Sequence, residues 1–276
     1  MHKVALFNGK FIDGADAKLT ALSAAALFGR GVFTTIAIYD GRPFLIDKHL
    51  KRLRSSSAAI SLNRSEEELF SIEQRLNELI RLNSVANGRA RITLFDATAS
   101  RMWAGKSEER VECFIVTADP RQVSADLKLT VSPYSINSRA PLAGIKSCNY
   151  LENLMAKDEA KARGFDEAIR ANERGEVTSA CMANLFWTKD DQLLTPSLAT
   201  GCLAGTTREF ILENFDCREV TVAADELRSA DSIFITSAGI GVRQLNKFDE
   251  REFTDSTHPL LDLLPIADKK TRMSAE

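Results

Sequence analysis

The sequence has little of what metal sites, disulfide frameworks and membrane spans require. Its three histidines, His2, His49 and His258, are too far apart in sequence to form a zinc motif. The five cysteines are odd in number and lack paired short spacings, so we expect free thiols in a reducing cytoplasm and no bound metal. No window approaches the ~20 apolar residues of a membrane span, and the start of the chain lacks a signal-peptide core. We therefore expect a cytoplasmic protein that does not bind a membrane.

The sequence also lacks an excess of charge of one sign. Lysine and arginine number 36 against 38 aspartates and glutamates, which gives a formal net charge of −2 over 276 residues. Such a chain has no overall positive field to hold a polyanion, so nucleic-acid binding is disfavoured. A small-molecule ligand fits this composition better.

The length is typical of two modest domains or one large one. Proline and polar residues interrupt two strand-like runs at Asp119 to Ala125, DPRQVSA. We therefore predict an N-terminal domain at 1–118, a linker at 119–125 and a C-terminal domain at 126–276. Clusters of strands mixed with helices, without regular βα alternation, predict the α+β class.

Local patterns predict several individual elements. Asp40-Gly41 between apolar runs predicts a tight hairpin over Val32 to Ile46, and Asp47 is expected to cap the helix that follows. Alternating apolar residues predict a half-buried strand over Arg89 to Phe95. Further helices are expected from about Tyr150 to Arg163 and after Gly205.

Few residues are left to carry chemistry. A hydrolase would have to depend on His49, which lies in a cationic run where an exposed helical histidine is the simpler interpretation. Lys146 precedes a helix, where burial would make its amine nucleophilic, although exposed lysines are commoner. The Gly205 turn that opens a helix suits a phosphate, and capping by Thr206 or Thr207 explains the same sequence equally well.

Taken together, these segments resemble the class IV aminotransferases, which are pyridoxal-phosphate enzymes that include branched-chain aminotransferases, D-amino acid transaminases and 4-amino-4-deoxychorismate lyases. The similarity runs in order through FGRGVFTTIAIYDGRPFLIDKHLKRL, KSCNYLENLMAKDEA, VTSACMANLFW, TPSLATGCLAGTTRE and FITSAGIGVRQL. It implies the two-domain fold of this family, with pyridoxal 5'-phosphate between a smaller N-terminal and a larger C-terminal domain. It also implies a homodimer.

The resemblance assigns roles to nine residues. Lys146 would form the Schiff base and Arg52 would hold the cofactor phosphate, whereas helical spacing alone would make Arg52 a solvated charge. Tyr150 matches a tyrosine that hydrogen-bonds the cofactor O3′, and Phe33 falls where an aromatic residue lines the substrate pocket. The remaining roles are phosphate binding by Thr206 and Thr207, a loop near the phosphate and the substrate carboxylate from Ser237 and Ala238, and a contact to the pyridine nitrogen from Ser179.

Ser179 departs from the family pattern. Most members carry a glutamate at this position, and its carboxylate keeps the pyridine nitrogen protonated. A hydroxyl supplies no negative charge to hold that proton, so the ring should withdraw electrons less strongly. Glu176 lies at an odd offset on the same predicted strand, so its side chain should point to the opposite face.

Three activities are compatible with these residues. The first is an aminotransferase that moves an amino group between an amino acid and a 2-oxo acid. The second is a 4-amino-4-deoxychorismate lyase, which eliminates pyruvate to give p-aminobenzoate and which VTSACMANLFW resembles more closely. The third is a cofactor-binding protein with little catalysis. Arg89, Arg91 or Arg101 could recognise a substrate carboxylate, although surface charge on a strand is the commoner role.

Overall fold

The computed structural model describes residues 1–62, 66–100, 103, 105 and 109–263, with the side chains of 66–70 left out. The chain forms two compact units. The first unit contains Met1–Arg121 and Lys146–Asn149, and the second contains Gln122–Ile145 and Tyr150–Glu276. One short segment, Lys146–Asn149, therefore lies in the first unit, whereas the sequence had assigned it to a continuous domain at 126–276. The two units are described separately below.

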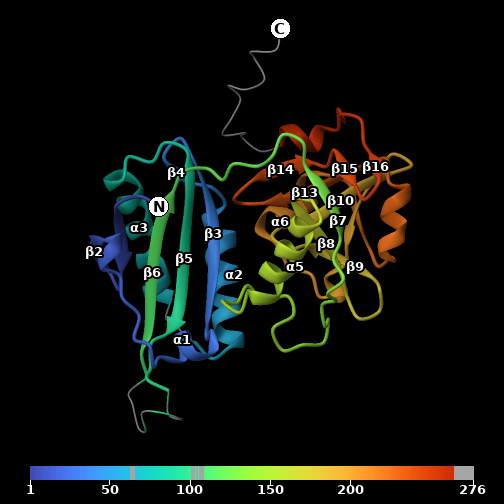
Figure 1. The fold of residues 1–276 in the computed structure, drawn as a ribbon. Helices are drawn as coiled ribbons and strands as arrows, with labels where there is room; N and C mark the ends of the chain where they lie inside the picture. The colour runs from blue at the N-terminus through green and yellow to red at the C-terminus, as the bar shows by residue number, and fades with distance from the viewer. Residues whose placement is uncertain (63–65, 101–102, 104, 106–108, 264–276) are drawn as a thin grey trace. The chain divides into compact units, whose positions relative to one another are not determined.

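A six-stranded sheet with the order β2-β1-β6-β5-β3-β4 forms the first unit (Figure 1). Its strands pair antiparallel throughout. Helix α2 packs on β3, and helix α3 packs on β1, β4 and β6. The elements are β1 (Val4–Phe7), β2 (Lys10–Asp13), a 3-10 helix (Gly14–Asp16), α1 (Ala24–Phe28), β3 (Gly31–Tyr39), β4 (Arg42–Pro43), α2 (Ile46–Ala59), α3 (Glu66–Leu82), β5 (Gly88–Asp96) and β6 (Val111–Ala118).

The hairpin between β3 and β4 forms where the sequence predicts it. Asp40 and Gly41 take φ of 49° and 72°, as this kind of tight turn requires. The second strand is much shorter than expected, because the chain turns after Pro43 and α2 begins at Ile46. Leu45, in the left-handed region at φ 55°, occupies the N-cap position. The predicted Asp47 cap is therefore wrong, and Asp47 lies in the first helical turn, where its charge favours the helix dipole.

The Lys146–Asn149 segment joins the first unit through backbone hydrogen bonds. Phe33 N–H donates to the carbonyl of Lys146 over 2.9 Å, and Cys148 N–H donates to the carbonyl of Gly31 over 2.8 Å. Ser147 forms an isolated bridge with Val32. The segment thus extends the sheet beside the first residues of β3, although it is more than a hundred positions away in sequence.

Two five-stranded sheets form the second unit, with the orders β12-β11-β10-β13-β14 and β16-β15-β7-β8-β9. The sheets mix parallel and antiparallel pairs, which confirms the α+β class. The elements are β7 (Lys128–Val131), α5 (Leu151–Ala162), β8 (Glu167–Ala171), β9 (Val177–Ala180), β10 (Asn184–Lys189), β11 (Gln192–Pro196), α6 (Thr206–Asn214), β12 (Cys217–Val220), β13 (Ser232–Ser237), β14 (Gly241–Gln244), β15 (Lys247–Phe248), β16 (Arg251–Glu252), and 3-10 helices at Leu198–Thr200, Ala224–Ser229 and Pro259–Asp262.

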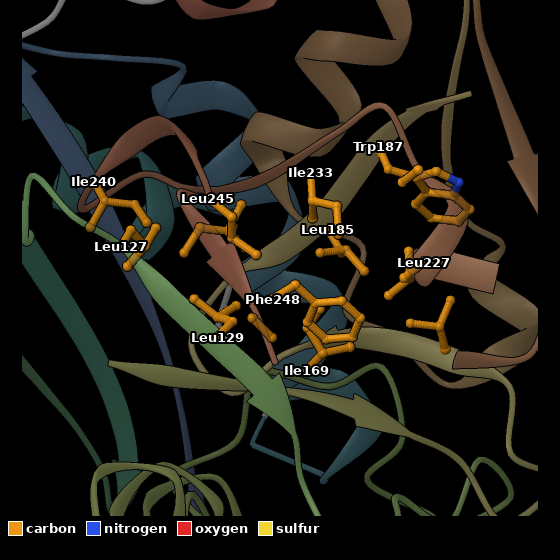
Figure 2. Close-up of a cluster of buried hydrophobic side chains, with 14 residues drawn as sticks. Leu127, Leu129, Ile169, Leu185, Trp187, Leu227, Ile233, Ile240, Leu245 and Phe248 are labelled. Atoms are coloured by element: carbon orange, nitrogen blue, oxygen red, sulfur yellow. The ribbon is translucent and has the colours of Figure 1, made fainter. Parts of the chain in front are cut away.

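The main core of the second unit lies between these two sheets. Figure 2 shows its side chains, which include Leu129 and Ile169 from one sheet and Leu185, Trp187 and Ile233 from the other. Each of these five is at most 1 % exposed. Burying a side chain of this size stabilises the fold by roughly 1.5–3 kcal/mol, so this cluster holds the strands that carry the candidate residues in a fixed register.

Helix α5 covers a second, smaller cluster. Ala156 and Ala160 on one helix face pack with Ala168 of β8 and Cys181. Their small side chains let the helix backbone approach the strand closely. One face of β8 therefore packs on the main core, and its other face is turned toward α5. All five cysteines of the chain are free thiols, and Cys113, Cys181 and Cys202 are buried.

Candidate active site

Lys146 in the first unit has the properties of a reactive amine. Its Nζ lies 4.6 Å from the centre of the Phe33 ring, on the face of that aromatic side chain. Burial lowers its pKa to about 7, and the positive charges of Arg52 and Arg91 add to this effect. A large fraction of this amine is thus uncharged near neutral pH, and an uncharged amine can attack a carbonyl carbon.

Arg52 is held in place by a short chain of polar side chains. Its Nη2 donates to Thr34 Oγ1 over 2.8 Å, and that oxygen lies 2.7 Å from His49 Nδ1. Because a guanidinium can only donate, Thr34 accepts from Arg52 and can give its own hydroxyl proton to the histidine. Arg52 is therefore partly buried and anchored to β3, and it is not the solvated charge that its helical position suggests.

His49 is buried within this group and is only 1 % exposed. Burial lowers the pKa of His49 well below its ordinary value, and Arg52 and Lys146 repel its protonated form. The interpretation of His49 as a surface histidine is therefore wrong. The neutral form of His49 is therefore favoured, its Nδ1 shares a hydrogen bond with Thr34 Oγ1, and the positive charge of the group belongs to Arg52.

Phe33 lies in contact with two basic side chains in the same unit. The guanidinium carbon of Arg91 lies 3.6 Å from the centre of its ring, on which Lys146 Nζ also lies. Arg91 Nε donates to Thr93 Oγ1 over 3.2 Å, and Arg91 is otherwise exposed. Of the three arginines considered for a substrate carboxylate, Arg91 is the one placed beside Lys146, whereas Arg101 lies outside the described residues.

In the second unit, Thr206 and Thr207 form the first turn of α6. Gly205 occupies the N-cap position with φ −72° and ψ 140°, and no side chain caps the helix. The two threonines are therefore not capping residues, and both are nearly fully buried. The first backbone N–H groups of a helix have no acceptor within it and lie at its positive end, which suits an anion.

An unsatisfied hydroxyl lies on β13 beside Asn184, the residue that reaches the turn before α6. Thr236 Oγ1 on β13 is buried without a hydrogen-bond partner among the described residues. Thr236 pairs directly with Asn184 of β10, so the two side chains share one face of the sheet. Asn184 reaches the turn before α6, where it donates to the carbonyl of Leu203 over 2.8 Å. A hydroxyl left unpaired in this way is costly unless a ligand supplies its partner.

Gly205 leaves room for the Asn184 side chain at the start of α6. A Cβ placed on Gly205 would lie 1.9 Å from Asn184 Oδ1, which is far inside van der Waals contact.

Ser237 ends β13, and Ala238 follows in the turn that leads to β14, where Ile240 N–H donates to the carbonyl of Ser237 over 3.1 Å. Helix α6 packs on β13, so the helix start and this strand end belong to adjoining elements.

Ser179 and Tyr150 lie elsewhere in the second unit. Ser179 is a half-buried residue of β9, directly opposite Arg170 of β8. Glu176 is engaged away from it, because its carboxylate accepts from Asn172 Nδ2 over 2.7 Å and pairs with Arg174. Tyr150 is half-buried at the N-cap position of α5, and its carbonyl accepts from Leu154 N–H.

The structure thus groups the predicted residues into two sets. Lys146, Arg52 and Phe33 meet in the first unit, and Thr206, Thr207, Ser237 and Ala238 come from adjoining elements of the second. Sequence reasoning missed Thr34, His49, Asn184 and Thr236. Within the described residues, no three His, Cys, Asp or Glu side chains are placed to share a metal ion. No helix in the described part of the chain is long and apolar enough to cross a membrane.

Comparison with known proteins gives a consistent family. The model of the family described as amino-transferase class IV matches residues 31–248. The chain is 28% identical over 272 residues to an aminodeoxychorismate lyase of Bacillus subtilis, covering 95% of this chain and 92% of that protein. It is 30% identical over 266 residues to a D-alanine aminotransferase of Staphylococcus aureus, covering 92% of each.

Solved structures share the fold. The branched-chain aminotransferase of Thermoproteus uzoniensis superposes with a TM-score of 0.86 at 24% identity, covering 95% of this chain and 92% of that one. A putative 4-amino-4-deoxychorismate lyase of Legionella pneumophila superposes with a TM-score of 0.82 at 24% identity, covering 91% and 94%.

Proposed function

Because the chain belongs to the class IV aminotransferase family, we propose that it is a pyridoxal 5'-phosphate enzyme that transfers an amino group between an amino acid and a 2-oxo acid. The observation that carries this proposal is the amine of Lys146, whose pKa is lowered to about 7. When bound, the cofactor supplies an aldehyde that condenses with amines and a ring that withdraws electrons.

The described residues fit such a cofactor. Lys146 offers an uncharged amine for covalent attachment, and Arg52 offers a positioned positive charge for a phosphate. In the second unit, the start of α6 and the unsatisfied Thr236 hydroxyl offer further donors for a phosphate. We assign phosphate binding to Arg52, Thr206 and Thr207, with Ser237 and Ala238 nearby.

The same residues can carry the proton transfers of the reaction. A large fraction of Lys146 Nζ is uncharged near pH 7. It can therefore accept a proton from the substrate Cα and deliver it to the cofactor C4′. Phe33 presents an apolar ring to the substrate, and Arg91, which lies against this ring, presents a fork that suits a carboxylate. Tyr150 is assigned to the cofactor O3′, and Ser179 to its ring nitrogen.

A lyase that converts 4-amino-4-deoxychorismate to p-aminobenzoate and pyruvate is the second candidate. The observation that favours it is Ser179, since the described side chains around β9 give no carboxylate in its place and Glu176 is held by Arg174. An elimination makes smaller demands on electron withdrawal by the ring than an amino transfer does.

The attachment of the cofactor is tested by chemical trapping. The protein is incubated with pyridoxal phosphate and reduced with borohydride, and its peptides are then analysed by mass spectrometry. We expect a single adduct on Lys146 and none in Lys146→Met. Lys157→Met is the matched control. Lys157 lies on α5 and pairs with Glu167 of β8, so its replacement should leave the adduct unchanged. An adduct that persists in Lys146→Met would contradict the assignment.

The two activities are separated by their products. Single amino acids added to the cofactor-loaded enzyme without a 2-oxo acid should yield one equivalent of 2-oxo acid per site if it is an aminotransferase. The lyase would yield none, and would release p-aminobenzoate and pyruvate in equal amounts from aminodeoxychorismate.

We further propose that the enzyme is a cytoplasmic homodimer. The free cysteines suit a reducing compartment, and the family resemblance supports the dimer. Sedimentation of the active enzyme tests the assembly, since activity in a strictly monomeric fraction would contradict it.

A further inference from the structure

A buried arginine lies directly across from Ser179. In the antiparallel pair of β8 and β9, Arg170 and Ser179 are register partners. Side chains of directly opposed residues emerge on the same face of a sheet, with Cβ atoms roughly 4.5–5.5 Å apart. Ala168, two residues before Arg170, packs under α5, so this shared face is the one turned toward α5 and not toward the main core.

The charge of Arg170 is held in place mainly by neutral acceptors, and its ion pair is with an exposed carboxylate. Its side chain is 1 % exposed, and it donates to the carbonyls of Tyr134 and Ser135 over 3.2 Å each and to Asn153 Oδ1 over 2.8 Å. These acceptors are neutral. Its ion pair with Glu152 spans 4.0 Å, and the Glu152 side chain is 83% exposed, so water screens that carboxylate.

Of the other ionisable groups near this face, the buried carboxylate of Glu167 is paired with Lys157 of α5 over 3.2 Å. Burial raises the pKa of the Cys181 thiol to about 11, so it is neutral at physiological pH. Burial lowers the pKa of Arg170, but a guanidinium stays protonated in proteins. The face of β8 and β9 that carries Ser179 is therefore locally cationic.

We propose that Arg170 is a positioning residue that sets the charge beside Ser179 and opposes protonation of the cofactor's ring nitrogen. This inference rests on the proposed function, which assigns that nitrogen to Ser179. A neighbouring cation favours the unprotonated, neutral form of a pyridine nitrogen, and the Ser179 hydroxyl can donate a hydrogen bond to its lone pair. Ser179 and Arg170 then act together, because a glutamate at position 179 would lie against the buried Arg170 and pair with it.

The protonation state is measured directly on the bound cofactor. The enzyme is loaded with pyridoxal phosphate carrying ¹⁵N in the ring, and the ¹⁵N chemical shift is followed between about pH 6 and 9. We expect an unprotonated nitrogen in the native enzyme at pH 7. In Ser179→Glu combined with Arg170→Met, we expect the nitrogen to be protonated, with its pKa raised by about 1–3 units.

Comparing Ser179→Glu with the double variant shows whether the two changes are coupled. Ser179→Glu alone should raise the nitrogen's pKa less than the double variant does, because the new carboxylate pairs with Arg170. Arg163→Met is the structural control, because Arg163 likewise donates to a backbone carbonyl, that of Val131, and to Thr130 from the end of α5. It should leave the ¹⁵N shift unchanged even if it lowers stability.

Two outcomes overturn the inference: a protonated nitrogen in the native enzyme at pH 7, or equal effects of Ser179→Glu with and without Arg170. The first needs no variant, so the test survives if Arg170→Met fails to fold. Trapping at Lys146 is run on the same samples. A missing adduct would count against the proposed function itself, whereas an adduct with a protonated nitrogen would count only against the role of Arg170.

Discussion

At the scale of single residues, the lowered pKa of Lys146 follows from what surrounds it. Burial removes the water that would stabilise its ammonium, and Arg52 and Arg91 add repulsion. Its ammonium faces the Phe33 ring, which attracts a cation only weakly by comparison. The balance leaves the amine largely uncharged near neutral pH.

The pH dependence of cofactor attachment should therefore differ from that of an ordinary lysine. We expect the attachment rate to rise with pH through a midpoint near about pH 7 and to level off roughly one to two pH units above it, where nearly all of the amine is uncharged. An ordinary lysine, with a pKa near about 10.4, would show a rate that still rises at pH 9. Initial rates of adduct formation at several pH values measure this.

Arg91→Gln sharpens the pH test. Removing one repelling cation raises the pKa of Lys146 toward its ordinary value, so the midpoint of the profile should move to higher pH. A midpoint that stays in place would show that Arg91 does not contribute to the lowered pKa. A rate that climbs steadily through pH 9 in the native protein would contradict the low pKa itself.

At the scale of secondary structure, local patterns were sufficient where one rule dominated. The Asp40-Gly41 turn and the alternating strand that became β5 (Gly88–Asp96) follow from two-residue turn chemistry and period-two burial. The start of α2 was not predictable, because Leu45 adopts a left-handed conformation that its side chain does not favour.

The candidate residues were selected by the family resemblance and not by local pattern. Arg52 and His49 look like surface charges on a helix, and only the position of Thr34 on β3 shows that they meet. The pairing of Arg170 with Ser179 depends on the register of two strands, and single-sequence periodicity does not reveal register.

The start of α6 offers an element-scale prediction. Gly205→Ala should lower the free energy of unfolding by about 1–3 kcal/mol and weaken cofactor binding, because the new Cβ forces Asn184 or the helix start to move. The φ of −72° suits alanine, so the cost is steric. Urea unfolding and cofactor titration measure the two effects.

A second change relieves the same clash. Asn184→Ala removes the amide that the Cβ would meet, so its combination with Gly205→Ala should cost less than the sum of the single changes. Gly239→Ala is the stability control, because its Cβ would meet only Ser237 Oγ at 3.9 Å. Additive costs would show that Asn184 is not what requires glycine at position 205.

At the scale of the whole molecule, the net charge is −2, whereas the charges beside Lys146 are positive. An anionic cofactor approaching a uniformly negative protein would be repelled, and added salt would screen that repulsion and speed binding. The first unit instead presents Arg52 and Arg91 beside Lys146. If this local field governs the encounter, added salt must slow binding.

We therefore expect the association rate of pyridoxal phosphate to fall as NaCl is raised from about 20 mM to about 500 mM, a range over which the screening length shrinks several-fold. Stopped-flow absorbance measures it. Arg91→Gln should flatten the salt dependence, whereas Arg218→Gln, on the edge strand β12, changes the net charge equally and should not. Equal slopes in the two variants, or binding that salt accelerates, would show that the total charge governs the approach and not the cations beside Lys146.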